Sequence, residues 1–264
     1  MPGPVPPQVI PRPPTWQPGG PAPWADVPTA ARTGISLATV LDALVEVGQR
    51  GDVPEDTGLD RMLGLTMLVN APDGEAVRHV NAGVLALMFE EHDETRLVLT
   101  RRSTALRTHR GEVSFPGGRL HEGETPVEGA LREAHEEVDL DTGTVVLAGW
   151  LHPVATLVSS SLIVPVLATT DARPALVASP DEVERIFDVA LAELAEPGVF
   201  HEERWRIAGR RVLASDGGDG GDDGDGGDEF PMWFFEIAGE MIWGATARML
   251  HELLSIVLTG RSGL

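Results

Sequence analysis

The stretch GRLHEGETPVEGALREAHEEVDL, residues 118–140, contains three glutamates that a helix would crowd onto one face. Glu133, Glu136 and Glu137 are spaced three and four residues apart, and side chains at these spacings are neighbours on a helix surface. Like charges placed this way cost about a few tenths of a kcal/mol each. A solvated acidic surface tolerates that cost, whereas Mg²⁺ would be attracted to the same oxygens. The acids alone leave both interpretations open.

The residues around these acids predict where the helix begins and which face it buries. Pro126 suits the first helical position, with Thr125 as the N-cap and Glu128 at the third position. We expect the acids to lie opposite the face that packs on a sheet. The residues predicted to form that apolar face are Val127, Ala130, Leu131, Ala134 and Val138.

The context of the helix favours a cation site over a solvated surface. The sequence FPGG, residues 115–118, lies just upstream, and Arg132 directly precedes the first acid. A tight glycine turn that leads to a helix lets backbone atoms approach a ligand closely.

The spacing of these residues resembles the Nudix box, the signature of a family of hydrolases. Asp139 departs from the signature, because it stands where the family has a glycine that ends the helix in a left-handed conformation. Aspartate tolerates that conformation better than most residues, so we expect modest destabilisation and intact chemistry. The positions that match the box are Gly118, Glu124, Arg132, Glu133, Ala134, Glu136, Glu137 and Leu140.

The resemblance implies an α/β fold of the Nudix type, an α/β/α sandwich with a mixed β-sheet. It also implies hydrolysis of a nucleoside diphosphate linked to another group, with Mg²⁺ or Mn²⁺ as the cofactor. By this resemblance Glu133 and Glu137 are the principal metal ligands. Glu136 adds a further ligand or a contact to bound water, and the carbonyl of Gly118 also meets the metal.

The remaining roles in the box also follow from the resemblance. Arg132 would hold a box glutamate by a charge-assisted hydrogen bond. Glu124 would contact the residues around the metal ligands and not the metal itself. The general base stays open among Glu133, Glu136 and an acid from a distant loop such as Glu182.

A second segment, VLTRRSTALRTHRGEVSFPGG at residues 98–118, resembles the signature of the coenzyme A pyrophosphatase branch of the family. The reaction this implies is coenzyme A plus water giving 4′-phosphopantetheine and adenosine 3′,5′-bisphosphate, with acyl- or oxidised coenzyme A as further substrates. Arginine forks suit phosphate oxygens, so Arg102 and Arg107 are the leading substrate contacts. The full set of predicted substrate contacts is Arg102, Arg107, Ser103, Phe115 and Gly117.

Two alternatives compete with this function. The first is a Nudix pyrophosphatase that acts on ADP-ribose, dinucleotides or other nucleoside diphosphate derivatives. The second belongs to another class, a non-catalytic nucleotide-sensing module. Such modules usually lose box acids, whereas Glu133, Glu136 and Glu137 are all present.

Composition sets the remaining bounds. The formal net charge of -21 disfavours nucleic acid and anionic membranes as partners, and leaves a small-molecule substrate. The chain has no cysteine, which excludes disulfides and cysteine metal sites. No apolar run approaches the roughly 18 residues of a membrane span, so we expect a cytoplasmic protein. The resemblance is compatible with a homodimer, although no pattern in the sequence identifies a dimer interface.

The chain divides into a proline-rich tail over residues 1–30, expected to be disordered or extended, and a Nudix domain over 31–264. A run of aspartate and glycine at 215–228 lacks the spacing of an EF-hand and is expected to be a flexible loop. Helices are predicted at 35–48, 188–197 and 243–258, and strands at 80–89, 96–102, 144–155, 161–170, 204–214 and 229–239.

Overall fold

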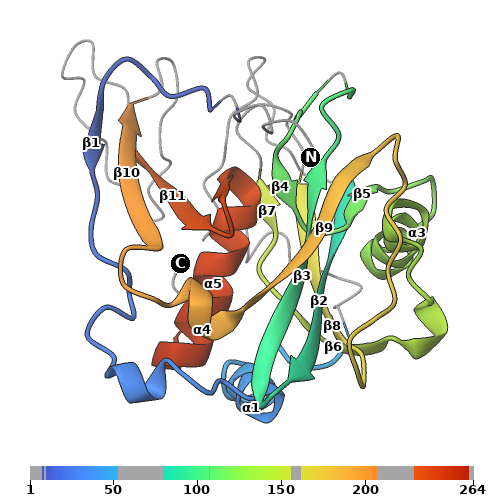
Figure 1. Ribbon diagram of the computed structural model, residues 1–264, viewed down its shortest axis with the longest axis horizontal. Helices are drawn as coiled ribbons and strands as arrows, with labels where there is room; N and C mark the ends of the chain where they lie inside the picture. Colours follow the sequence, from blue (N-terminus) through green and yellow to red (C-terminus); the bar gives the residue numbers. More distant parts are fainter. Residues whose placement is uncertain are drawn as a thin grey trace, which may run out of the picture.

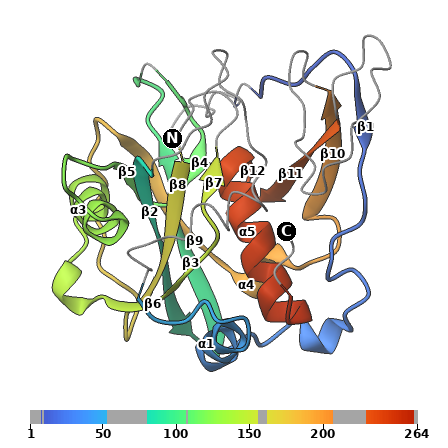
Figure 2. The same cartoon turned by 180° about the vertical axis from the view of Figure 1, so that it is seen from behind.

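The computed structural model describes residues 8, 10–52, 80–106, 108–155, 162–206 and 229–261. Within these ranges the strands form two sheets. Figures 1 and 2 show helix α5 (Gly244–Thr259) between the sheets and helix α3 (Pro126–Val138) on the outer face of the larger one. The predicted α/β/α sandwich is confirmed. The described ranges hold no helix that is both long and apolar enough to cross a bilayer.

The larger sheet is mixed, because β2 and β8 run parallel while the other paired strands are antiparallel. Its order is β4-β3-β2-β8-β6, with β5 paired to β2, β7 to β8 and β9 to β3. Among the described residues its strands are β2 (Ala82–Glu91), β3 (Glu94–Arg102), β4 (Val113–Ser114), β5 (Gly117–Arg119), β6 (Val146–Trp150), β7 (Val154–Ala155), β8 (Leu162–Thr169) and β9 (Val183–Ala190).

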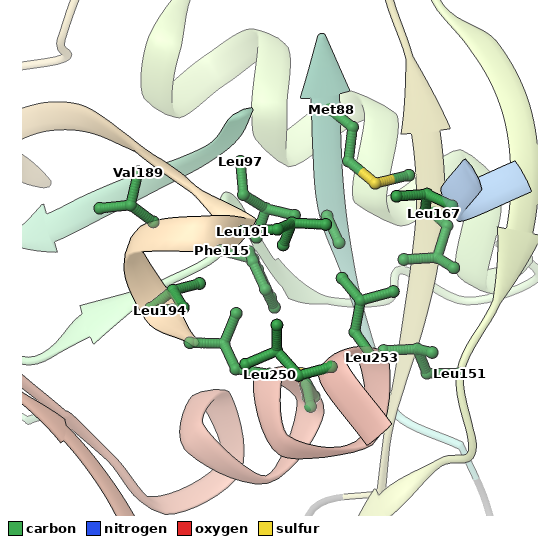
Figure 3. Close-up of a cluster of buried hydrophobic side chains, with 14 of the residues drawn as sticks. Met88, Leu97, Phe115, Leu151, Leu167, Val189, Leu191, Leu194, Leu250 and Leu253 are labelled. Atoms are coloured by element: carbon green, nitrogen blue, oxygen red, sulfur yellow. The ribbon is translucent and has the colours of Figure 1, made fainter. Parts of the chain in front are cut away.

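Side chains alternate across this sheet and build one core on each face. On β2, Leu85, Leu87 and Phe89 pack with α3, while Ala86 and Met88 join the core that contains α5. Figure 3 shows Met88, Leu97 and Leu167 of the sheet near Leu250 and Leu253 of α5. Burial on both faces fixes the register of β2, since a slip of one residue would exchange the two sets.

The smaller sheet covers the other side of α5 and includes part of the segment expected to be a tail. Trp16 pairs with Trp205, and Trp24 is only 2% exposed, packed among aromatic rings of the domain. Residues 16–18 are thus extended but joined to the domain, and the boundary near residue 30 stays a prediction. The strands of this sheet are β1 (Trp16–Pro18), β10 (Phe200–Arg206), β11 (Glu229–Ile237) and β12 (Glu240–Trp243). The predicted loop at 215–228 and residues 207–214 lie outside the described residues.

Two helix predictions need correction. Helix α1 (Leu37–Glu46) lies within the predicted range 35–48, and the apolar pattern that predicts it, which includes Val40, Leu44 and Val45, fits except at Val45, which is exposed. The segment from 188 begins as strand, because β9 pairs with β3 as far as Ala190, and helix α4 (Leu191–Leu194) is short. Short 3₁₀ helices are η1 (Thr29–Ala31) and η2 (Thr142–Thr144).

Candidate functional site

Helix α3 begins and ends where its local sequence predicts. Thr125 accepts a hydrogen bond from the backbone N–H of Glu128, and the Glu128 carboxylate accepts one from the N–H of Thr125. This capping box satisfies two of the free N–H groups at the helix start. At the other end Asp139 adopts the left-handed conformation, with φ 54° and ψ 37°, where the Nudix box has glycine.

Replacing Asp139 by glycine is expected to stabilise the fold by about 0.5–1 kcal/mol, because glycine takes the left-handed conformation without strain and removes a negative charge from the helix C-terminus. Urea denaturation measures this change, and kcat/KM should stay within about twofold, since the expected gain concerns only the helix end. Asp141→Gly is the contrast, because Asp141 accepts a hydrogen bond from the Gly143 N–H at 3.0 Å. Destabilisation by Asp139→Gly would contradict this account of the helix end.

The three glutamates do not share one environment. Ala130, Ala134 and Val138 pack on the larger sheet as predicted, but Glu137 lies with them and is only 2% exposed. The expectation that all the acids lie away from the sheet is therefore wrong for Glu137. Residue 137 follows Ala134 by three, the helical spacing that continues the buried stripe, and this signal was available in the sequence.

Glu137 is held by two residues from the segment upstream of the box. Its carboxylate accepts a hydrogen bond from Arg102 Nη1 at 3.2 Å and from the Gly117 N–H at 3.1 Å. Burial raises the pKa of Glu137 to about 7, opposed by these two donors and reinforced by the negative charges of Glu133 and Glu182. A buried carboxylate that faces two further acids would be stabilised by an added cation.

Arg132 joins the other acids of the helix. Its guanidinium donates to Glu124 through Nε at 2.7 Å and Nη2 at 3.0 Å, and to Glu133 through Nη1 at 3.0 Å. Arg132 Nη1 also contacts Glu136 Oε2 at the longer distance of 3.4 Å, and the Glu136 side chain is 55% exposed. Hydrogen bonds from Arg132 and from the His121 N–H lower the pKa of Glu124 to about 2. The arginine thus fixes Glu124 and Glu133 together.

The glycine pair at 117–118 brings the upstream segment against the helix. A Cβ on Gly118 would lie 2.5–2.6 Å from carboxylate atoms of Glu133, so a side chain at residue 118 would displace that carboxylate. Gly117 has φ +149°, and its N–H reaches Glu137. The backbone of β5 therefore lies between the two principal acids of the box.

The other predicted substrate contacts fall in three places. Ser103 donates its N–H to the Glu182 carbonyl at 2.7 Å, which joins the predicted distant acid to the signature segment. Phe115 is 1% exposed in the core beside α5, so the structure assigns it to packing and not to the site surface (Figure 3). Arg107 lies outside the described residues. Arg101, the residue before Arg102 in the signature, is buried and forms ion pairs with Glu240 and Glu184.

The donor chemistry of the helix fits a hard divalent cation. Glu133 and Glu137 offer carboxylate oxygens one turn apart beside the glycine backbone, which is the ligand type that Mg²⁺ and Mn²⁺ prefer. Among the residues that the structure describes, no three carboxylate or imidazole groups converge into a metal cluster. In this structure Arg132 and Arg102 are hydrogen-bonded to Glu133 and Glu137. The fit of the site to a divalent cation therefore rests on the carboxylate chemistry of these residues.

This combination of an α/β/α sandwich and a glutamate helix beside a glycine turn defines the Nudix class. Residues 77–210 match the family model described as the NUDIX domain, and the chain belongs to this family. It is 30% identical to Nudix hydrolase 3 of Caenorhabditis elegans over 61% of this chain and 66% of that protein, just under two thirds of the relative's length.

Two further similarities were found. The uncharacterized Nudix hydrolase NudL of Photorhabdus laumondii is 32% identical over 60% of this chain and 74% of its own length. Among solved structures, the Nudix hydrolase RenU of M. smegmatis is 21% identical, covers 46% of this chain and 78% of its own, and has a TM-score of 0.38.

Proposed function

We propose that the protein hydrolyses the diphosphate of coenzyme A to 4′-phosphopantetheine and adenosine 3′,5′-bisphosphate. The observation that carries this proposal is the contact between Arg102 and Glu137 at 3.2 Å. Arg102 belongs to the segment that resembles the coenzyme A branch, and Glu137 belongs to the box. Their contact supports a single site in which the specificity segment adjoins the catalytic acids.

In this proposal Glu133 and Glu137 hold the Mg²⁺ or Mn²⁺, with Glu136 and the Gly118 carbonyl as further ligands. The bound ion would neutralise diphosphate charge and lower the pKa of a bound water. Arg132 keeps Glu133 in place by the hydrogen bond at 3.0 Å, and Glu124 keeps Arg132 in place.

The chain's own acids would accept the proton of the attacking water. Glu133, Glu136 and Glu182 remain the candidates for this role. Glu182 is exposed, and its backbone carbonyl is bonded to the Ser103 N–H. That contact keeps the acid beside the signature segment, while its side chain stays free to reach a substrate.

The test is a comparison of kcat/KM for coenzyme A, ADP-ribose and a dinucleoside diphosphate, each with Mg²⁺ and with Mn²⁺. We expect coenzyme A to exceed the other two by about tenfold or more, the discrimination that an arginine contact to one additional phosphate supplies. Equal or better cleavage of ADP-ribose or the dinucleotide would replace this proposal by a general nucleotide pyrophosphatase. Tight nucleotide binding without turnover would indicate the non-catalytic module.

A further inference from the structure

The N-terminal segment (residues 8 and 10–18) is fixed to the smaller sheet by a charged residue. Arg12 Nη2 lies 2.8 Å from Oε1 of Glu203, a carboxylate on β10 that is only 1% exposed. The Arg12 guanidinium also lies over two rings, 5.2 Å from the centroid of Phe234 and 5.6 Å from that of Trp16. A guanidinium that pairs with a carboxylate while stacking on rings has few alternative positions. Arg12 therefore anchors the segment on the domain.

Residues ahead of this anchor reach the larger sheet. Ile10 packs against the small core around Trp205 and Phe234. Figures 1 and 2 both show the chain ahead of β1 leading from the smaller sheet toward the larger one. At residue 8 the Gln8 side chain donates a hydrogen bond from Nε2 to the carbonyl oxygen of Gly111 at 2.6 Å. One side-chain amide thus joins the N-terminal segment to the signature segment at 98–118.

Gly111 is bonded directly to the backbone of Arg102, the leading substrate contact. The Gly111 N–H donates to the Arg102 carbonyl at 3.1 Å, and the Arg102 N–H donates to the Glu112 carbonyl at 2.9 Å. Gly111 is buried and has φ +66°, a conformation that glycine adopts without strain. Both backbone groups of Arg102 thus depend on where Gly111 and Glu112 lie. A displacement of Gly111 would shift Arg102 with it.

The turn between Arg102 and Gly111 has hydrogen bonds from other elements at its two ends. At the start the Ser103 N–H donates to the Glu182 carbonyl at 2.7 Å, and at the end Gly111 accepts from Gln8 at 2.6 Å. Most of the described residues between these ends are exposed, so packing holds the turn only weakly. The hydrogen bond from Gln8 therefore contributes directly to the position of the turn.

We propose that Gln8 is a positioning residue of the candidate site. Its hydrogen bond to Gly111 holds the turn that begins at Arg102, and so keeps the guanidinium beside Glu137, which it contacts at 3.2 Å, and toward a substrate phosphate. That Arg102 binds substrate rests on the proposed function. Gln8 lies outside residues 77–210, which match the family model, so the N-terminal segment would add a support that the family domain does not include.

Steady-state kinetics of Gln8→Met tests this role, because methionine keeps the length of the side chain and removes the donor. We expect KM for the diphosphate substrate that the wild type cleaves best to rise about fivefold, the size of one ordinary hydrogen bond. The turnover number kcat should stay within about threefold, since the Gly117 N–H still holds Glu137. The melting temperature should fall by less than about 2 °C. Gln17→Met is the matched control, because Gln17 lies exposed in the same segment, and it should leave KM unchanged.

A second variant tests whether Gln8 acts through Arg102. In the Arg102→Gln background, Gln8→Met should raise KM no further, as expected for residues in one chain of contacts. Deuterium exchange without substrate gives a separate measure of the turn. The Arg102 and Gly111 N–H groups should exchange about fivefold faster in Gln8→Met than in Gln17→Met, because the turn opens more often.

Three results would overturn the positioning role. They are an unchanged KM in Gln8→Met, an equal rise of KM in Gln17→Met, and a further rise when Gln8→Met is added to Arg102→Gln. A lower melting temperature with unchanged KM would show that Gln8 only supports the fold. Wild-type protein that cannot cleave coenzyme A would refute the proposed function, whereas deuterium exchange at Arg102 and Gly111 would still decide on Gln8.

Discussion

Replacing Glu137 by glutamine is expected to lower kcat by a factor on the order of 10³ and to leave the fold intact. The substitution removes the negative charge of a principal metal ligand and keeps its shape. Burial already raises the pKa of this carboxyl to about 7, so a neutral amide costs the fold little. The amide oxygen can still accept from Arg102. Steady-state kinetics with saturating Mg²⁺ measures the loss, and the melting temperature should change by less than about 3 °C.

Glu122→Gln is the matched control, because Glu122 is exposed in the turn before α3 and belongs to none of the contacts of the site. It should retain full activity. Full activity of Glu137→Gln would refute the assignment of Glu137 as a metal ligand. Unfolding of that variant would show that the carboxylate serves mainly to anchor β5.

Replacing Gly117 by alanine is expected to destabilise the protein by about 3 kcal/mol or more and to abolish activity. A Cβ at this position would lie 2.5 Å from the Gly83 carbonyl oxygen and 2.5 Å from Val84 Cα. Both atoms belong to the backbone of β2, so neither can move aside as a side chain would. The φ of +149° adds strain for any residue with a Cβ. Urea denaturation measures the free energy of unfolding.

Gly20→Ala is the control, since a Cβ there meets nothing within 4 Å and the residue has no positive φ. It should change stability by less than about 0.5 kcal/mol. A Gly117→Ala variant as stable as Gly20→Ala would show that β5 is free to shift away from β2. The contact between the Gly117 N–H and Glu137 would then be only one of several arrangements.

Local signals predicted helix α3 almost to the residue. Thr125 and Pro126 act within a few residues of the helix start, whereas the end at Asp139 came from the resemblance to the Nudix box, which has a helix-ending glycine at that position. The fold class came from the resemblance of the box to the Nudix family, because the spacing of the box by itself describes only one helix and one turn. The sequence also predicted strands β2 and β3 from their apolar runs, and both strands are largely buried.

Contacts between distant segments were not predictable in this way. Trp24 stands alone in a proline-rich segment, and its ring partners Phe200 and Phe235 lie far along the chain. The motif predicts Phe115 as a substrate contact, whereas its side chain is buried in the core that also contains Leu250 of α5. The pairing of Arg102 with Glu137 likewise depends on how β3 and α3 meet.

The most direct test of the proposed chemistry is the hydrolysis of coenzyme A in ¹⁸O-labelled water with Mg²⁺, followed by mass analysis of the products. We predict 4′-phosphopantetheine and adenosine 3′,5′-bisphosphate, with a single ¹⁸O atom in the new phosphate of one of them, because water breaks the diphosphate directly. Intact coenzyme A, or the same products without label, would contradict hydrolysis of this diphosphate at the glutamates of helix α3.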